Sequence, residues 1–198
     1  AVALVEAVQH YAREQGWAGI EITVPPQCYS TDIAGFIEAA LFFRGFRLEH
    51  RWLCHILPLS RERSFEQIFR HNQISCVRTA QARGVTAVEQ GVDGLDGFLA
   101  VFNDTYERHG SKPTHSPDEI RYLLERLGGR VRIHLATQDG APIAGLLVFR
   151  LTSYVANAFY ICRSSQQSGQ HGAAFSIADA LERLAREGFR YLDLGPSA

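Results

Sequence analysis

The feature that most constrains the fold is an Asp139-Gly140 pair between two apolar runs. Asp-Gly favours a two-residue turn with positive φ at both positions, and this turn joins antiparallel strands. The flanking runs, 131–138 and 141–150, are rich in Val, Ile, Leu and Ala. The sequence therefore predicts an antiparallel hairpin here, and the rest of the chain must supply its neighbours and its cover.

Further elements follow from periodicity and from start and stop signals. Ser116-Pro117 predicts a helix start with an N-cap and a first-turn proline, and Gly84 predicts a helix end. The predicted helices are 2–16, 31–43, 64–83, 95–108, 116–128 and 173–187, and the predicted strands are 19–24, 47–59, 85–89, 131–138, 141–150, 154–162 and 190–194.

A helix-turn-strand ending occurs twice. Residues 12–22 parallel residues 185–194 with one residue deleted, and in each copy a glycine, Gly16 or Gly188, is followed by an aromatic and an apolar-acidic-apolar strand. Residues 61–194 also hold one domain's worth of elements in order. We therefore expect two similar units, the C-terminal part of a first unit in 1–60 and a second unit in 61–198; an accidental repeat is the alternative.

Composition excludes several classes of protein. Lys plus Arg number 20 and Asp plus Glu 21, a formal net charge of -1, so no overall basic field attracts DNA, and a tRNA partner would need a local basic patch. The 4 cysteines lie far apart without metal-ligand spacing, so we expect reduced thiols, no metal and a cytoplasmic protein. No apolar run approaches the ~20 residues of a membrane span, so no integral membrane segment is expected.

The first residues already have helical periodicity, and the chain contains 0 Met, the initiator included. We therefore expect the true N-terminus to lie upstream of Ala1.

The glycine-containing segment 166–174, between a strand and a helix, resembles the acyl-CoA loop of GNAT acyltransferases. The resemblance implies that backbone N–H groups at the helix start hold the pyrophosphate of acyl-CoA, a role suited to glycine and to the helix dipole. Gly172 and Ala174 fit the family pattern, whereas Gly169 occupies a position where the pattern has Gln or Arg. The implied cofactor residues are Gln167, Gly169, Gln170, His171, Gly172 and Ala174.

The order of elements in the second unit also resembles the GNAT fold, which implies an α/β (α+β) chain with a mixed, mostly antiparallel sheet flanked by helices. In the first unit, 40–46 resembles a GNAT ending in which a Tyr often stands four residues before the Gly. This chain has Leu41 there, so the resemblance leaves the first unit without the family's acidic phenol.

A narrower resemblance is to the FemAB-like branch, which forms peptidoglycan bridges and carries two GNAT-like domains in one chain. The segment 70–85 is similar to that branch's basic helix ending in Gly-Val, and 191–195 to its aromatic-Asp-apolar-Gly strand. Members continue past the residue matching Gly195, so we expect the second unit to be incomplete at Ala198.

Three residues are candidates for catalysis, each with a structural alternative. Asp193 would orient or deprotonate an acceptor amine, or else accept backbone N–H groups of the next loop. His134 would be a base in the cleft, on the same strand face as Arg132, or else a partly exposed strand histidine. Tyr160 alternates with Phe159 and would face the cleft beside Cys162, or else pack in the core.

Two arginines are candidates for substrate binding. Arg78 lies on the basic helix and would grip a phosphate of a lipid-linked substrate or tRNA, or else belong to a solvated helix face. Arg132 shares a strand with His134.

These observations predict an N-acyltransferase that moves an acyl group from acyl-CoA to an amine of a cell-envelope or polysaccharide precursor. An aminoacyl-tRNA-dependent transferase of the FemAB type and a GNAT-like protein that only binds a ligand are the alternatives. Attack would be direct, helped by proximity and by backbone donors at a strand bulge that stabilise the oxyanion.

Overall fold

A computed structural model describes residues 1–30 and 35–196. The described chain divides into two compact units, one of residues 1–54 and one of His55–Pro196. The glycine-containing loop and all candidate site residues belong to the second unit.

The first unit is a pair of helices with irregular segments. Helix α1 (Val2–Glu14) packs on α2 (Phe36–Phe43), and the short 3-10 helix η1 (Gln27–Tyr29) lies between them in sequence. Its small core contains Val5, Ala40 and Leu41. The first four residues of the predicted helix 31–43 lie outside the described residues.

Residues 19–24 are not a strand, contrary to the sequence-based prediction. A strand needs a neighbour to take its backbone hydrogen bonds, and none of the described residues between Ala1 and Leu53 forms one. The predicted strand 47–59 is likewise shortened to β1 (Cys54–Pro58), which joins the sheet of the second unit.

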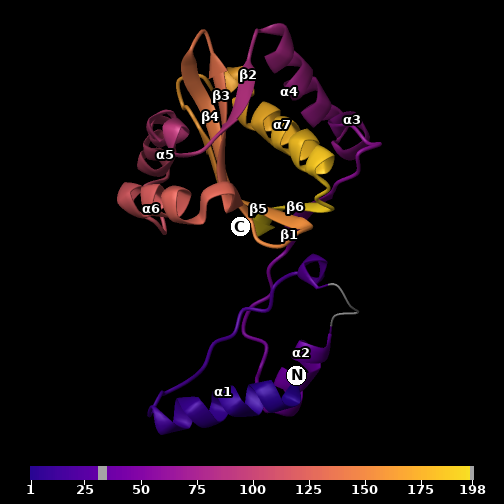
Figure 1. Cartoon of the computed structure of the whole chain (residues 1–198), viewed down its shortest axis with the longest axis vertical. Coiled ribbons are helices and arrows are strands. Elements are labelled where there is room, and N and C mark those ends of the chain that lie inside the picture. Colours follow the sequence, from indigo (N-terminus) through magenta and orange to yellow (C-terminus); the bar gives the residue numbers. More distant parts are fainter. Residues whose placement is uncertain (31–34, 197–198) are drawn as a thin grey trace. The chain divides into compact units, whose positions relative to one another are not determined.

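The second unit is built on a six-stranded sheet in the order β1-β6-β5-β4-β3-β2 (Figure 1). Neighbours from β2 to β5 pair antiparallel, and β5 pairs with β6 in parallel. The mixed, mostly antiparallel sheet expected from the GNAT resemblance is confirmed. Beside β1, its strands are β2 (Thr86–Gln90), β3 (Val131–Gln138), β4 (Ala141–Arg150), β5 (Val155–Arg163) and β6 (Tyr191–Pro196).

The β3–β4 hairpin forms at the predicted turn. Asp139 has φ 51° and Gly140 φ 79°, the positive values that a two-residue turn between right-twisted strands requires. The hairpin registers Gln138 opposite Ala141 and brings Leu135 opposite Gly145. The hairpin that the Asp139-Gly140 pair predicts is therefore confirmed.

Helices cover both faces of this sheet (Figure 1). On one face, α5 (Leu95–His109) and α6 (Pro117–Leu127) enclose a core that includes Phe98, Phe102, Leu147 and Tyr160. On the other, α7 (Gly172–Glu187) packs on the strands and α4 (His71–Ala82) packs on α7. The chain also contains 3-10 helices η2 (Val92–Gly94), η3 (Gly128–Arg130) and η4 (Ser168–Gln170).

The predicted helix 64–83 is two helices, α3 (Phe65–Ile68) and α4. Ser64 and Gln67 form a capping box around a single turn, and Phe69 and Arg70 then adopt extended backbone before α4 begins. The Phe65 ring is buried and lies 6.0 Å from the Phe69 ring, so packing of the two aromatics accompanies the break. Periodicity alone could not reveal it.

Candidate functional site

The candidate site begins where β5 and β6 separate. Their parallel ladder runs over three residue pairs, from Val155 opposite Tyr191 to Asn157 opposite Asp193. Beyond Asn157, β5 continues to Arg163 along β4, whereas no further pairing with β6 occurs among the described residues. The backbone of β5 after Asn157 is therefore available on that edge to a ligand.

A β-bulge lies directly after this point. Leu147 of β4 stands opposite Tyr160 and Val148 opposite Ala158, so Phe159 is an extra residue in β5. The bulge changes the face to which the following side chains point. Ala158 packs in the α7 core, whereas Tyr160 packs in the α5 core.

Tyr160 is hydrogen-bonded to a histidine, His115, in the loop before α6. Its hydroxyl oxygen accepts the backbone N–H of His115 at 3.0 Å and lies 2.9 Å from the ring Nδ1 of the same residue. The Phe159 ring contacts the His115 ring edge-on, at 5.4 Å between centroids. His115, only partly buried, is thus held against the bulge.

Tyr160 and Cys162 do not face an open cleft, as the sequence alternation suggested, because the bulge turns both into the core beside α5. Burial raises the pKa of the Cys162 thiol to about 12. A thiol in this environment stays protonated at neutral pH and is therefore a poor nucleophile.

Asp193 is buried, at the last position where β6 pairs with β5. Its Oδ1 accepts the Gly195 backbone N–H at 2.8 Å, and its backbone oxygen accepts the Asn157 side-chain amide at 3.4 Å. The structural alternative, an Asp that binds an amide of the following segment, is present in the fold. Any catalytic role of Asp193 remains a prediction, although the residue does lie at the separation of β5 and β6.

The glycine-containing loop ends at the N-terminus of α7. His171 has φ 57° and precedes the helix, but its side chain makes no capping hydrogen bond. Among the described residues, the amides of Gly172, Ala173 and Ala174 have no backbone acceptor, whereas Phe175 donates to the His171 oxygen. Three amide donors are therefore available at the positive end of a 16-residue helix.

Gly172 is fixed by close packing. A Cβ at this position would lie 2.8 Å from Ile143 Cγ1 and 3.0 Å from Ala144 Cβ, so the helix start sits directly on β4. Gly169 has no atom within 4 Å of such a Cβ. Of the two loop glycines, only Gly172 is thus required by its surroundings.

Arg83, at the end of α4, holds this loop in place. Its Nη1 donates to the Gly169 backbone oxygen at 2.6 Å and to Gln170 Oε1 at 3.1 Å. The Arg83 backbone oxygen accepts the Gln138 side-chain amide at 2.9 Å. The Gln167 side-chain oxygen is buried and lacks a hydrogen-bond partner among the described residues.

His134 lies elsewhere, in an ion cluster beneath α7. Its ring is fully buried, with Nε2 3.6 Å from Glu89 Oε2 and Nδ1 3.6 Å from Asp179 Oδ2. Arg132 is on the same strand face as predicted, and its Nε lies 3.4 Å from Glu89 Oε1. The expectation that His134 points into a cleft, or is partly exposed, is wrong.

The ion cluster joins three strands to α7. Arg150 on β4 contacts both Glu89 oxygens at 3.1 Å and a Glu187 oxygen at 2.9 Å, and Arg183 donates to Asp179 at 2.7 Å. Burial raises the pKa of Asp179, but His134 and Arg183 outweigh it and hold that pKa below 3.8. We call this set the α7 ion cluster; its members are Glu89, Arg132, His134, Arg150, Asp179, Arg183 and Glu187.

Arg78 lies on the exposed face of α4, where its guanidinium binds Glu66 at 2.8 Å. It lines a shallow hollow of ≈ 290 Å³ with His71, Ile74, Ser75, Thr79 and Ala82. The structure does not bring Arg78 together with Asp193, Tyr160 or the loop, and a role in binding substrate remains a prediction.

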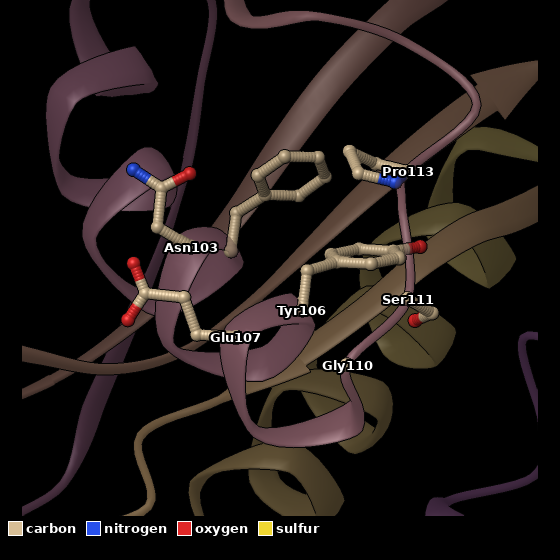
Figure 2. A pocket seen from close by; sticks show the side chains of 7 residues that line it. Asn103, Tyr106, Glu107, Gly110, Ser111 and Pro113 are labelled. Atoms are coloured by element: carbon tan, nitrogen blue, oxygen red, sulfur yellow. The ribbon is translucent and has the colours of Figure 1, made fainter.

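A second hollow, of ≈ 270 Å³, lies at the end of α5. Figure 2 shows the Tyr106 ring directed toward the segment that carries Ser111 and Pro113, with Asn103 and Glu107 on the helix side. Phe102 and Tyr106 also contact the Tyr160 ring, at 5.1 and 6.0 Å between centroids. One layer of aromatic rings therefore separates this hollow from the bulge.

Several site residues were missed by the sequence analysis. His115 precedes a helix cap and is 45 positions from Tyr160, so no local pattern links the two. Arg83 was identified only as part of a basic helix, and Glu89 and Asp179 only as members of a strand and a helix. In the described residues, no group of three His, Cys, Asp or Glu side chains is placed to hold a metal ion. None of the helices described is long and apolar enough to span a bilayer.

A mostly antiparallel sheet with one parallel pair, β5 and β6, a bulge where these two strands separate and a helix N-terminus that follows β5 in the chain define a GNAT-type α/β fold. The sequence model described as "Acetyltransferase (GNAT) domain" matches residues 69–198, and the chain belongs to this family. No curated protein sequence matches the chain.

Solved structures share the fold at low sequence identity. FemX superposes with a TM-score of 0.72 at 15% identity, covering 98% of this chain and 67% of FemX. L-PGS from Bacillus licheniformis superposes with a TM-score of 0.70 at 11% sequence identity, covering 98% of this chain and 57% of that protein. A C-terminal domain from Agrobacterium fabrum, described as belonging to a lysylphosphatidylglycerol synthetase, superposes with a TM-score of 0.63 at 14% sequence identity. The match covers 82% of this chain and 52% of that domain. The chain thus spans about half to two thirds of these proteins.

Proposed function

We propose that this chain carries the donor site of an N-acyltransferase whose acceptor is an amine of a cell-envelope or polysaccharide precursor. The observation that carries the proposal is the N-terminus of α7, where three free amides lie at the end of a loop anchored by Arg83. Backbone amides and a helix dipole together form a site for phosphate oxygens.

The residues present fit the diphosphate of acyl-CoA. Gly172 brings the helix start onto the sheet without a side chain in the way. Acyl-CoA would supply an activated thioester carbonyl. Gly172, Ala173 and Ala174 would bind the phosphate through their amides, and the uncovered edge of β5 would align the rest of the donor.

The bulge at Phe159 gives the site a second backbone feature. A bulge leaves one residue, here Phe159, outside the regular ladder of hydrogen bonds. We propose that the backbone amide of Phe159 donates to the carbonyl oxygen of the donor as negative charge develops on that oxygen. Asp193, bound to the Gly195 amide, would orient the acceptor nitrogen from the end of β6. The acceptor would approach over the aromatic hollow at the end of α5.

Aminoacyl-tRNA is the second candidate donor. It is favoured by the structural likeness to a protein named for lysylphosphatidylglycerol, an aminoacylated lipid, and by the FemAB-like resemblance. The exposed, arginine-containing face of α4 would then contact tRNA phosphates. A cytoplasmic location is part of this proposal, since both donors are made there.

Hydrogen exchange distinguishes the two donors. Addition of acetyl-CoA should slow exchange of the amides of residues 169–174, with little change on α4. Charged tRNA, in contrast, should protect α4 around Arg78. Protection by neither donor, together with no thiol release from acetyl-CoA across a panel of amines, would favour a protein that only binds a ligand.

A further inference from the structure

His115 and Tyr160 form a hydrogen-bonded pair of titratable side chains beside the bulge. The Tyr160 oxygen accepts the His115 backbone N–H, so the loop that carries His115 is fixed to β5 by a main-chain bond as well as a side-chain bond. The Tyr160 ring is in turn packed among Phe102, Tyr106 and Phe159. The histidine therefore has a defined position although it lies in a loop.

The bond to Tyr160 leaves the other ring nitrogen for chemistry. A phenol oxygen has two lone pairs and can accept from both the backbone N–H and a protonated Nδ1. In that tautomer, Nε2 carries a lone pair and is a base. When Nε2 takes a proton, the Nδ1–H bond to Tyr160 persists and stabilises the imidazolium.

We propose that His115 is a catalytic residue of the acyl transfer and that Tyr160 is its positioning residue; this inference rests on the proposed function. The acceptor nitrogen attacks the carbonyl carbon, a C–N bond forms, and the nitrogen loses a proton to His115 Nε2. The bond from carbon to the leaving sulfur or oxygen then breaks, its electron pair stays on that atom, and the atom takes the proton from Nε2. Histidine returns to its neutral form.

The surroundings of His115 suit this cycle. Tyr160 on β5 faces its Nδ1, Tyr106 on α5 lies behind Tyr160, and Glu119 on α6 is near enough to interact with its charge. The Ser116 amide and hydroxyl lower the pKa of Glu119, and His115 adds to this effect. Glu119 therefore remains a carboxylate at neutral pH, close to the loop that carries His115.

The test compares His115→Phe, Tyr160→Phe and, as the matched control, His55→Phe, which changes an exposed histidine on β1. Thiol release and amide product are measured with acetyl-CoA and the best amine, from pH 5 to pH 9. We expect His115→Phe to lower kcat by about 10²–10⁴-fold, the usual contribution of a general acid or base, with little change in the KM for the donor. In the wild type, we expect kcat to rise with pH in the neutral range. This rise should be absent from His115→Phe and present in the other two variants.

Tyr160→Phe should keep that rise and lower kcat about tenfold, because the base remains but loses its orientation. In ¹⁵N-histidine-labelled protein, this variant should also change the tautomer balance of the His115 ring. If folded His115→Phe keeps kcat within threefold and an unchanged pH profile, the inference is overturned. If His115→Phe does not fold, an unchanged His115 ¹⁵N spectrum and an unchanged kcat in Tyr160→Phe overturn it equally. Absence of turnover in the wild type rejects the proposed function instead.

Discussion

At the scale of single residues, close packing at Gly172 gives the sharpest expectation. Gly172→Ala places a methyl group 2.8 Å from Ile143 Cγ1, and we expect the free energy of unfolding to fall by about 1–3 kcal/mol, as is typical of overpacking. Gly169→Ala is the control, because open space surrounds it and a change within about 0.5 kcal/mol is expected. Urea unfolding measures both. Equal effects of the two substitutions would contradict the packing of α7 on β4.

The Cys162 thiol leads to a second residue-scale prediction. Because burial raises its pKa to about 12, Cys162 should resist alkylation at pH 8 in the folded protein and react only on unfolding. Mass spectrometry of iodoacetamide-treated protein, with and without urea, measures this. Cys162→Ala should keep turnover within a few-fold of the wild type. Complete loss of turnover in a folded Cys162→Ala variant would instead indicate that Cys162 carries the acyl group covalently.

Local patterns predicted only part of the site at this scale. Gly172 was named because segment 166–174 resembles the acyl-CoA loop of the GNAT family, and its role in binding a donor stays a prediction. His115, Arg83 and Asp179 were not predicted, since each acquires its partner only when distant segments meet in the fold. Tyr160 packs in the core, the alternative that the sequence analysis left open, because a single extra residue at Phe159 reverses the alternation of the strand.

At the scale of elements, the α7 ion cluster fixes the helix that bears the proposed donor site. Asp179→Asn removes the charge that pairs with Arg183 and His134, and we expect a loss of roughly 1.5–3 kcal/mol of stability at pH 7. The pKa of Asp179 is lowered in the folded protein, so its stabilisation is present above 3.8 and is lost as pH falls through the folded value. The difference between wild type and variant should therefore shrink in acid.

Urea unfolding from pH 7 to the lowest pH at which the wild type is folded tests this dependence. Glu125→Gln, on the exposed side of α6, is the control and should leave stability unchanged throughout. If the free energies of unfolding of Asp179→Asn and wild type differ by the same amount at every pH, the substitution has removed packing and not a charge interaction.

Elements were predicted well where a local signal and tertiary packing agree. The hairpin at Asp139-Gly140, the capped helix at Ser116 and the helix that ends at Gly188 all form as predicted. The segment 19–24 has the pattern of a strand but no partner, and 64–83 has helical periodicity across a break. Partner strands and aromatic packing are properties of the assembled unit, which periodicity does not contain.

At the scale of the whole molecule, the two units differ in the core that each encloses. Three apolar clusters, all formed by residues from Leu59 onward, lie between the sheet and its helices. The first unit has one small cluster and leaves Phe36, Phe42 and Phe43 about three-quarters exposed, at 74%, 76% and 76%. Ordering each residue costs about 1–2 kcal/mol, so a small domain needs more burial than this.

We therefore expect a fragment of residues 55–196 to unfold cooperatively in urea, with far-UV circular dichroism that shows both helix and strand. A fragment of residues 1–54 should show no cooperative transition. Exposed apolar side chains such as Phe36, Phe42 and Phe43 bind hydrophobic dyes, so the full chain should also bind such a dye more strongly than the 55–196 fragment. If 55–196 failed to fold while the full chain unfolded in one transition, the sheet would depend on the first unit, and the donor site could not be assigned to the second unit alone.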